Sequence, residues 1–130
     1  REGVKWLPEK NIDVFFVTLN KADKDYSPTT MYNDYSINES LFHWQSQSTT
    51  AENSPTGQRY IHHKERGSKV LLFVREFKAD RMTGGAEAYT YLGTASYVKH
   101  EGSRPMNITW QLDRPIPAKF LKKTNKLVVG

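Results

Sequence analysis

The chain contains no cysteine, which excludes disulfide bonds and thiolate ligands for a metal ion. It also lacks any hydrophobic run near the roughly 20 residues that a transmembrane helix needs, and no signal peptide is visible at its N-terminus. The lack of such a run excludes a helical membrane span within this sequence. We expect a domain in the reducing environment of the cytoplasm, without a membrane partner.

Sequence motifs of several enzyme classes are missing as well. There is no Gly-Lys-Thr phosphate loop, no Asp-Glu-Ala-Asp box and no Gly-x-Ser-x-Gly nucleophile turn. The spacing of the four histidines matches no structural zinc pattern, since they stand at His43, His62, His63 and His100. We therefore expect no ATP chemistry within this chain, and neither a cofactor nor a metal.

The chain has 130 residues and a formal net charge of +5. That length suits one domain with a real core, so we assign residues 1–130 to a single domain. The first residue is Arg1 rather than Met, and we expect a piece of a longer or processed protein. A basic balance favours polyanions such as nucleic acid, although a mild excess of lysine explains the charge equally well.

Short runs of β-branched, aromatic and alternating residues predict most of the secondary structure. The run over 70–77 is the strongest, and its first five residues are apolar on both faces, which predicts a central strand. Further strands are predicted over 14–19, 41–45, 89–93, 95–100 and 106–112, with a bend at Gly93.

Little helix is expected. Polar or glycine-rich connections are predicted over 21–30, 46–58 and 79–87, and residues 60–63 as a short strand or turn. A short helix follows Pro117 over 118–123. The pattern predicts a mainly β fold, or α+β with little helix, in the form of a small antiparallel barrel or a strongly bent sheet.

Residues 41–50 are the most informative stretch. Amide and hydroxyl groups crowd around two large rings there, and burying so many polar groups is costly. A surface that stacks on a nucleobase and hydrogen-bonds its edges would use this mixture, and its residues are Phe42, His43, Trp44, Gln45 and Gln47. Alternatively, period two places Phe42 and Trp44 together in the core and leaves the polar side chains to line a groove on the opposite face.

Basic residues follow this stretch along the chain. If their strands are neighbours, several of them form one stripe that contacts phosphates, and we assign this role to Arg59, Lys64, Arg75 and Arg104. The alternative is a set of scattered, solvated charges. Two further rings, Tyr91 and Trp110, are predicted to belong to the core.

The segment Glu76-Phe77-Lys78 has the Glu-x-Lys spacing of many restriction-type nucleases. Carboxylates would hold Mg²⁺ there, and the lysine would lie near the attacking water. The second acid that such a site needs is not evident, and Asp34 and Glu52 are candidates by position only.

Three segments together carry a family resemblance: residues 42–47 (FHWQSQ), 72–76 (LFVRE) and 91–112. From about Asn33 onward the chain resembles an uncharacterised domain at the C-terminal end of bacterial DEAD/DEAH-box helicases. Many of those proteins also carry a phospholipase D-type nuclease domain. The resemblance implies an accessory module beside a DNA motor and a nuclease, acting in restriction or DNA repair. Architecture and aromatic content also suggest an analogy with the PUA-like and SRA-like readers of modified bases.

These observations lead to a first hypothesis of a non-catalytic accessory domain of a helicase. It would bind DNA and read its structure or a modified base, with the helicase and nuclease domains of the same polypeptide as partners. One alternative is a protein-interaction or regulatory module. Another is a Mg²⁺-dependent nuclease that uses Glu76 and Lys78.

Overall fold

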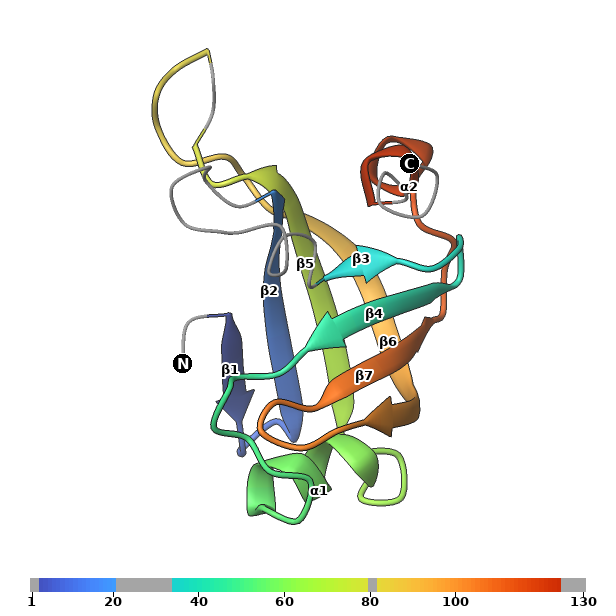
Figure 1. Ribbon diagram of the computed structural model, residues 1–130. Helices are drawn as coiled ribbons and strands as arrows, with labels where there is room; N and C mark the ends of the chain where they lie inside the picture. Colours follow the sequence, from blue (N-terminus) through green and yellow to red (C-terminus); the bar gives the residue numbers. More distant parts are fainter. Residues whose placement is uncertain (1–2, 21–33, 80–81, 125–130) are drawn as a thin grey trace.

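The structure is a computed structural model that describes residues 3–20, 34–79 and 82–124. Seven strands and two short helices make up this part of the chain (Figure 1). The strands are β1 (Val4–Leu7), β2 (Ile12–Asn20), β3 (Tyr35–Ser36), β4 (Leu41–Gln45), β5 (Lys69–Phe77), β6 (Thr90–Glu101) and β7 (Asn107–Leu112). The predicted connection over 21–30 lies outside the described residues.

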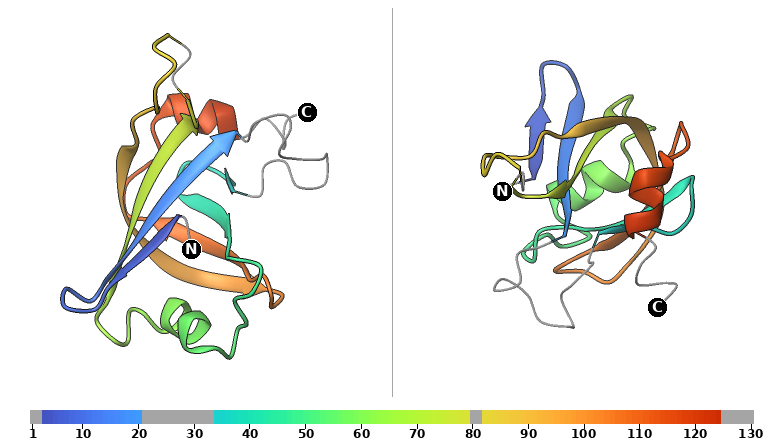
Figure 2. Two further views of the ribbon diagram at one scale, coloured as in Figure 1. Left: turned by 90° about the vertical axis from the view of Figure 1, so that its left-hand side faces the viewer. Right: turned by 90° about the horizontal axis from the view of Figure 1, so that it is seen from above.

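All seven strands belong to one sheet in the order β1-β2-β5-β6-β7-β4-β3. Neighbours are antiparallel except β2 and β5, which are parallel. The connection between these two strands is long enough for a parallel crossover, since it contains β3, β4 and α1. The predicted mainly β class is therefore confirmed. Of the two predicted forms, the strongly bent sheet is observed (Figure 2). The sheet is mixed rather than wholly antiparallel, and in the described residues it does not close into a barrel.

The bend brings strands that are not neighbours in the sheet face to face across one core. Phe15 of β2 stacks on Trp44 of β4 with their ring centroids 4.2 Å apart, and Trp110 of β7 meets the edge of Phe15 at 5.4 Å. Such stacked and edge-to-face ring pairs stabilise a core beyond their burial alone. Trp110 is thus a core residue, as predicted, and is 1% exposed.

The prediction that Phe42 and Trp44 stack on a base is wrong. Each of these residues is only 1% exposed, because alternate residues of β4 face the interior of the bend. The period-two alternative describes β4 correctly: its aromatic residues fill the core and its polar residues lie on the outer face.

Helix α1 (Pro55–Ile61) occupies a segment that was predicted as a loop followed by a short strand or turn. Its start has two ordinary helix signals. The Ser54 hydroxyl accepts a hydrogen bond from the Gly57 N–H at 3.0 Å, and Pro55 stands in the first turn. The helix buries Tyr60 against the core rings. Helix α2 (Ala118–Thr124) confirms the predicted C-terminal helix.

Both helices have seven residues, far fewer than the roughly 20 that cross a bilayer. No helix in the described part of the chain is therefore a candidate membrane span.

A buried histidine joins the end of α1 to an irregularity in β6. The His63 ring is a neutral tautomer, because Nδ1 faces the Ser68 carbonyl oxygen at 3.1 Å and must donate to it. Nε2 then accepts the N–H of Tyr97 at 3.1 Å, next to the point where the pairing of β6 with β7 shifts. Burial lowers the pKa of His63, which favours this neutral form.

Candidate nucleic-acid interface

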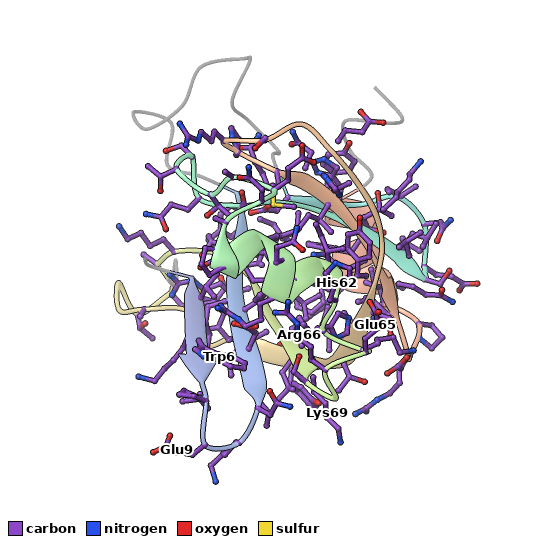
Figure 3. All side chains as sticks on the ribbon, turned by 90° about the horizontal axis from the view of Figure 1, so that it is seen from below. Trp6, Glu9, His62, Glu65, Arg66 and Lys69 are labelled. Atoms are coloured by element: carbon purple, nitrogen blue, oxygen red, sulfur yellow. The ribbon has the colours of Figure 1, made fainter. Side chains whose placement is uncertain are left out.

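A pocket of about 340 Å³ lies between β1, the loop 46–54 and α1. Figure 3 shows this end of the molecule from below, with α1 across the end of the bent sheet and Trp6 on the side of β1. We call it the Trp6 pocket, and its lining residues are Val4, Trp6, Gln47, Thr49, Thr50, Ser54, Thr56, Arg59 and Tyr60. It therefore combines flat rings with hydroxyl, amide and guanidinium groups.

One wall of the Trp6 pocket is built around Arg59. Its Nε and Nη2 atoms donate to the two carboxylate oxygens of Asp13 at 2.8 and 2.9 Å. The Asp13 side chain is 0% exposed and that of Arg59 17%. The guanidinium carbon also lies 4.4 Å from the centre of the Trp6 ring. The geometry therefore corrects the prediction of a phosphate contact: Arg59 neutralises a buried carboxylate and supports Trp6.

The loop wall is held by hydrogen bonds to the β6–β7 turn. The Ser46 N–H donates to the Met106 carbonyl at 2.9 Å, and the Met106 N–H donates to the Ser46 hydroxyl at 2.8 Å. The Arg104 N–H donates to the Thr50 carbonyl at 2.9 Å. Arg104 thus fixes the loop through its backbone, and its side chain is exposed.

A chain of three side chains ties the same loop to β6. Burial raises the pKa of Tyr97, so its phenol stays protonated and donates to Nδ1 of His100 at 2.7 Å. Nε2 of His100 then donates to the Glu52 carboxylate at 2.7 Å. With these bonds the loop is fixed at both ends before any ligand arrives.

The polar residues of the 41–50 stretch have three different environments. The His43 ring stacks on Tyr35 at 4.6 Å and lines a separate hollow of about 350 Å³. The Gln45 side-chain amide donates to the Asn107 oxygen at 3.1 Å. Gln47 is exposed and belongs to the Trp6 pocket. The structure does not gather Phe42, His43, Trp44, Gln45 and Gln47 into one reading surface, and of these five residues only Gln47 lines the Trp6 pocket.

The prediction of a single stripe of cations that contacts phosphates is also wrong. Arg75 lies on the outer face of the sheet, where Nε donates to the Thr18 hydroxyl at 2.9 Å. Arg59 instead pairs with Asp13. The Asp13 side chain is on the opposite face of β2 from Thr18 and points to the interior. Lys64 is exposed just after α1. Cations on opposite faces of one sheet cannot follow one strand of DNA.

The proposed nuclease residues stand at the far end of β5 from α1. The Glu76 N–H donates to a carboxylate oxygen of Glu87 at 2.9 Å. Glu52 is engaged by His100, and Asp34 accepts the Gln45 N–H at 2.9 Å. Within the described ranges, no three His, Asp or Glu residues gather where they could hold a metal ion.

Sequence reasoning missed Trp6, because β1 was not predicted. Its four residues, Val-Lys-Trp-Leu, alternate weakly in exposure, which leaves little periodicity to detect. The turn that follows did carry a signal: Pro8 precedes Asn11, and Asn11 adopts a positive φ of 58°. A proline and an asparagine at this spacing before a strong strand favour a hairpin.

Fold and pocket define a small, mainly β domain with a ligand-sized hollow at the open side of a bent sheet. Residues 2–123 match the sequence model of a domain of unknown function, DUF3427, and the chain belongs to that family. No curated protein sequence matches the chain significantly. The family agrees with the expectation of an uncharacterised domain.

Proposed function

We propose that this domain binds DNA without catalysing a reaction and takes one base out of the helical stack into the Trp6 pocket. One observation carries the proposal: a flat indole ring, an exposed amide and several hydroxyls line the same hollow of about 340 Å³. That volume lies within the roughly 300–1,000 Å³ of small-ligand sites. A base that is read outside the duplex needs an aromatic surface and hydrogen-bonding groups around its edge.

Each side chain has a distinct role in this proposal. Trp6 provides the ring for stacking, while Gln47, Thr49 and Thr56 provide donors and acceptors for the base edge. Arg59 keeps the indole in place through its contact at 4.4 Å. Because Asp13 holds Arg59 in turn, the stacking surface is organised before the base enters, which lowers the entropic cost of binding.

Phosphate contacts come from cations near the loop and α1. The side chains of Lys64 and Arg104 are exposed, and Arg104 is bonded through its backbone to the pocket loop. The net charge of +5 favours the same ligand. These two residues remain the phosphate contacts of the proposal.

The resemblance to helicase C-terminal domains supplies the wider context. In a bacterial protein that combines a DNA motor with a phospholipase D-like nuclease, a domain that captures one abnormal base would select where the motor engages. Restriction of modified DNA and DNA repair both need such selection. The proposal therefore also includes recognition of a modified base and selection of the site where a DNA motor engages.

Three duplexes of one sequence test the pocket: one fully paired, one with a central mismatch and one with a methylated central base. Extruding a mismatched base costs less, so the mismatched duplex should bind more tightly than the paired one. Trp6→Ala and Gln47→Ala should remove this preference. Gln111→Ala is the matched control, because Gln111 is also an exposed glutamine but lies on the outer face of β7.

Equal affinity for all three duplexes, or an unchanged preference in both pocket variants, would refute base capture. A fluorescent base analogue at the central position reports unstacking directly. The methylated duplex then shows whether the pocket discriminates a modification, because the two paired duplexes differ by one methyl group.

A protein-interaction role is the second candidate, and exposed apolar side chains favour it. Met82 is 94% exposed and Ile37 39%, which suits a docking surface. The dependence of binding affinity on salt concentration distinguishes the two functions. DNA binding should weaken steeply as salt rises, whereas apolar docking should respond little.

A further inference from the structure

Three aromatic rings form a row across the outer face of the sheet, opposite the core and the Trp6 pocket. Phe16 of β2 is the register partner of Phe73 in β5, and Phe73 is the partner of Tyr91 in β6. Their ring centroids are 5.5 Å and 4.9 Å apart. We call these residues the aromatic row. Tyr89 extends it, with its ring 5.2 Å from that of Phe16.

The row reaches solvent at Tyr91, which is 41% exposed. The sequence predicted Tyr91 to be a core residue, and this prediction is wrong. A shift in register between Leu72 and Phe73 pairs Leu72 with Gly93 and Phe73 with Tyr91, so the strand changes its alternation there. The buried side chain of this segment is Leu92 instead.

Arginines accompany two of these rings, Tyr91 and Tyr89. The Arg114 guanidinium lies 5.7 Å from the centre of the Tyr91 ring, and Gly93 leaves room for it: a Cβ at Gly93 would stand 3.3 Å from Arg114 Nε. Arg75 lies 4.4 Å from the centre of the Tyr89 ring. Arg114 is exposed and, among the described residues, forms no ion pair with a carboxylate.

We propose that the aromatic row and Arg114 form a second nucleic-acid surface, which binds a single strand. Neighbouring strands that each present a ring give unpaired bases a continuous place to stack, regardless of sequence. A duplex hides those base faces, so the row discriminates single strands from duplexes. The unpaired guanidinium beside the exposed ring favours a phosphate backbone over an apolar protein partner. This surface shares no side chain with the Trp6 pocket.

Fluorescence anisotropy with a labelled oligothymidine measures this binding directly. Tyr91→Ala should weaken the affinity about tenfold, as expected for the loss of one base stack. Tyr91→Phe keeps the ring and should bind like the unmodified chain. Both variants leave the buried core untouched, because Tyr91 is 41% exposed.

The phosphate contact is tested by the salt dependence of the same titration. Arg114→Ala should reduce the slope of log affinity against log salt by about 0.7, the value for one phosphate of a single strand. Arg66→Ala removes an equal charge from an exposed position between α1 and β5, on the end of the molecule that Figure 3 shows, and should leave the slope nearly unchanged.

The results also separate this surface from the pocket. Trp6→Ala should leave oligothymidine binding intact even if it removes the preference for a mismatched duplex. Absence of oligothymidine binding by the unmodified chain, or equal binding by Tyr91→Ala and Tyr91→Phe, would overturn the single-strand surface. A salt-insensitive affinity for a protein partner that Tyr91→Ala abolishes would also overturn it, and would make the row a docking site.

Discussion

Replacing Arg59 by methionine should destabilise the protein strongly. The change removes both N–H donors, at 2.8 and 2.9 Å, from a carboxylate on Asp13 that is 0% exposed. Breaking a buried pair from one side costs about 3–5 kcal/mol, because the remaining charge is left uncompensated. A domain of this size has a free energy of unfolding of about 5–15 kcal/mol, so a large share of it should disappear.

A double variant that recovers stability would distinguish the loss of a charge partner from a simple loss of packing. The double variant Asp13→Leu/Arg59→Met removes both charges, and replacing a buried ion pair by apolar side chains of similar volume is often neutral. It should therefore recover most of the stability that Arg59→Met loses. Arg66→Met is the control, since Arg66 is exposed and surface changes stay within about 0.5 kcal/mol.

Urea denaturation followed by far-UV circular dichroism provides the measurement for all four proteins. An Arg59→Met variant within about 1 kcal/mol of the unmodified chain would refute the reasoning, because that is the cost of an ordinary substitution. A double variant less stable than Arg59→Met would refute it as well.

Three further predictions concern other parts of the molecule. Because the pKa of His63 is lowered in the folded chain, the unfolded chain binds more protons than the folded one below about pH 6.5. Urea midpoints should therefore fall as the pH drops below that value. The fall should be smaller in His63→Gln. Gly57→Ala should cost about 1–3 kcal/mol despite the better helix propensity of alanine, because its Cβ would stand 2.2 Å from the Ala51 carbonyl oxygen; Gly85→Ala, whose nearest neighbour would be 3.6 Å away, should unfold at an unchanged urea midpoint. Plasmid DNA incubated with Mg²⁺ should stay intact, whereas cleavage that Glu76→Ala abolishes would establish the nuclease alternative.

Strand periodicity made much of the fold predictable. The strand over 41–45 was placed at its observed bounds, and the central position of 70–77 follows from a run that is apolar on both faces, although only its inner face is fully buried. Helix α1 was not predicted, because Ser54, Pro55 and Gly57 are also typical loop residues. Ser54 and Pro55 are local signals of a helix start that could have been recognised, whereas the close contact of Gly57 with the Ala51 carbonyl depends on the packed loop.

The candidate site was less predictable, because its residues come together only through the bend of the sheet. Gln47 was found for its amide, although the rings beside it face the core. Arg59 was selected because it is basic, but its charge is neutralised by Asp13, which is 46 positions away in the sequence. No local pattern shows a pairing at this separation, and Trp6 belongs to the site through the same long-range contact.

Alternation along β2 separates the two proposed binding surfaces. Asp13 and Phe15 face the interior, where they support Arg59 and the core rings, while Phe16 faces outward and begins the aromatic row. Because the two surfaces share a backbone but no side chains, substitutions in each should act independently. The affinity losses of Trp6→Ala and Tyr91→Ala should then add, in free energy, on a probe with both a mismatch and a single-stranded tail. A loss in the double variant no larger than in either single variant would mean that one surface alone contacts the DNA.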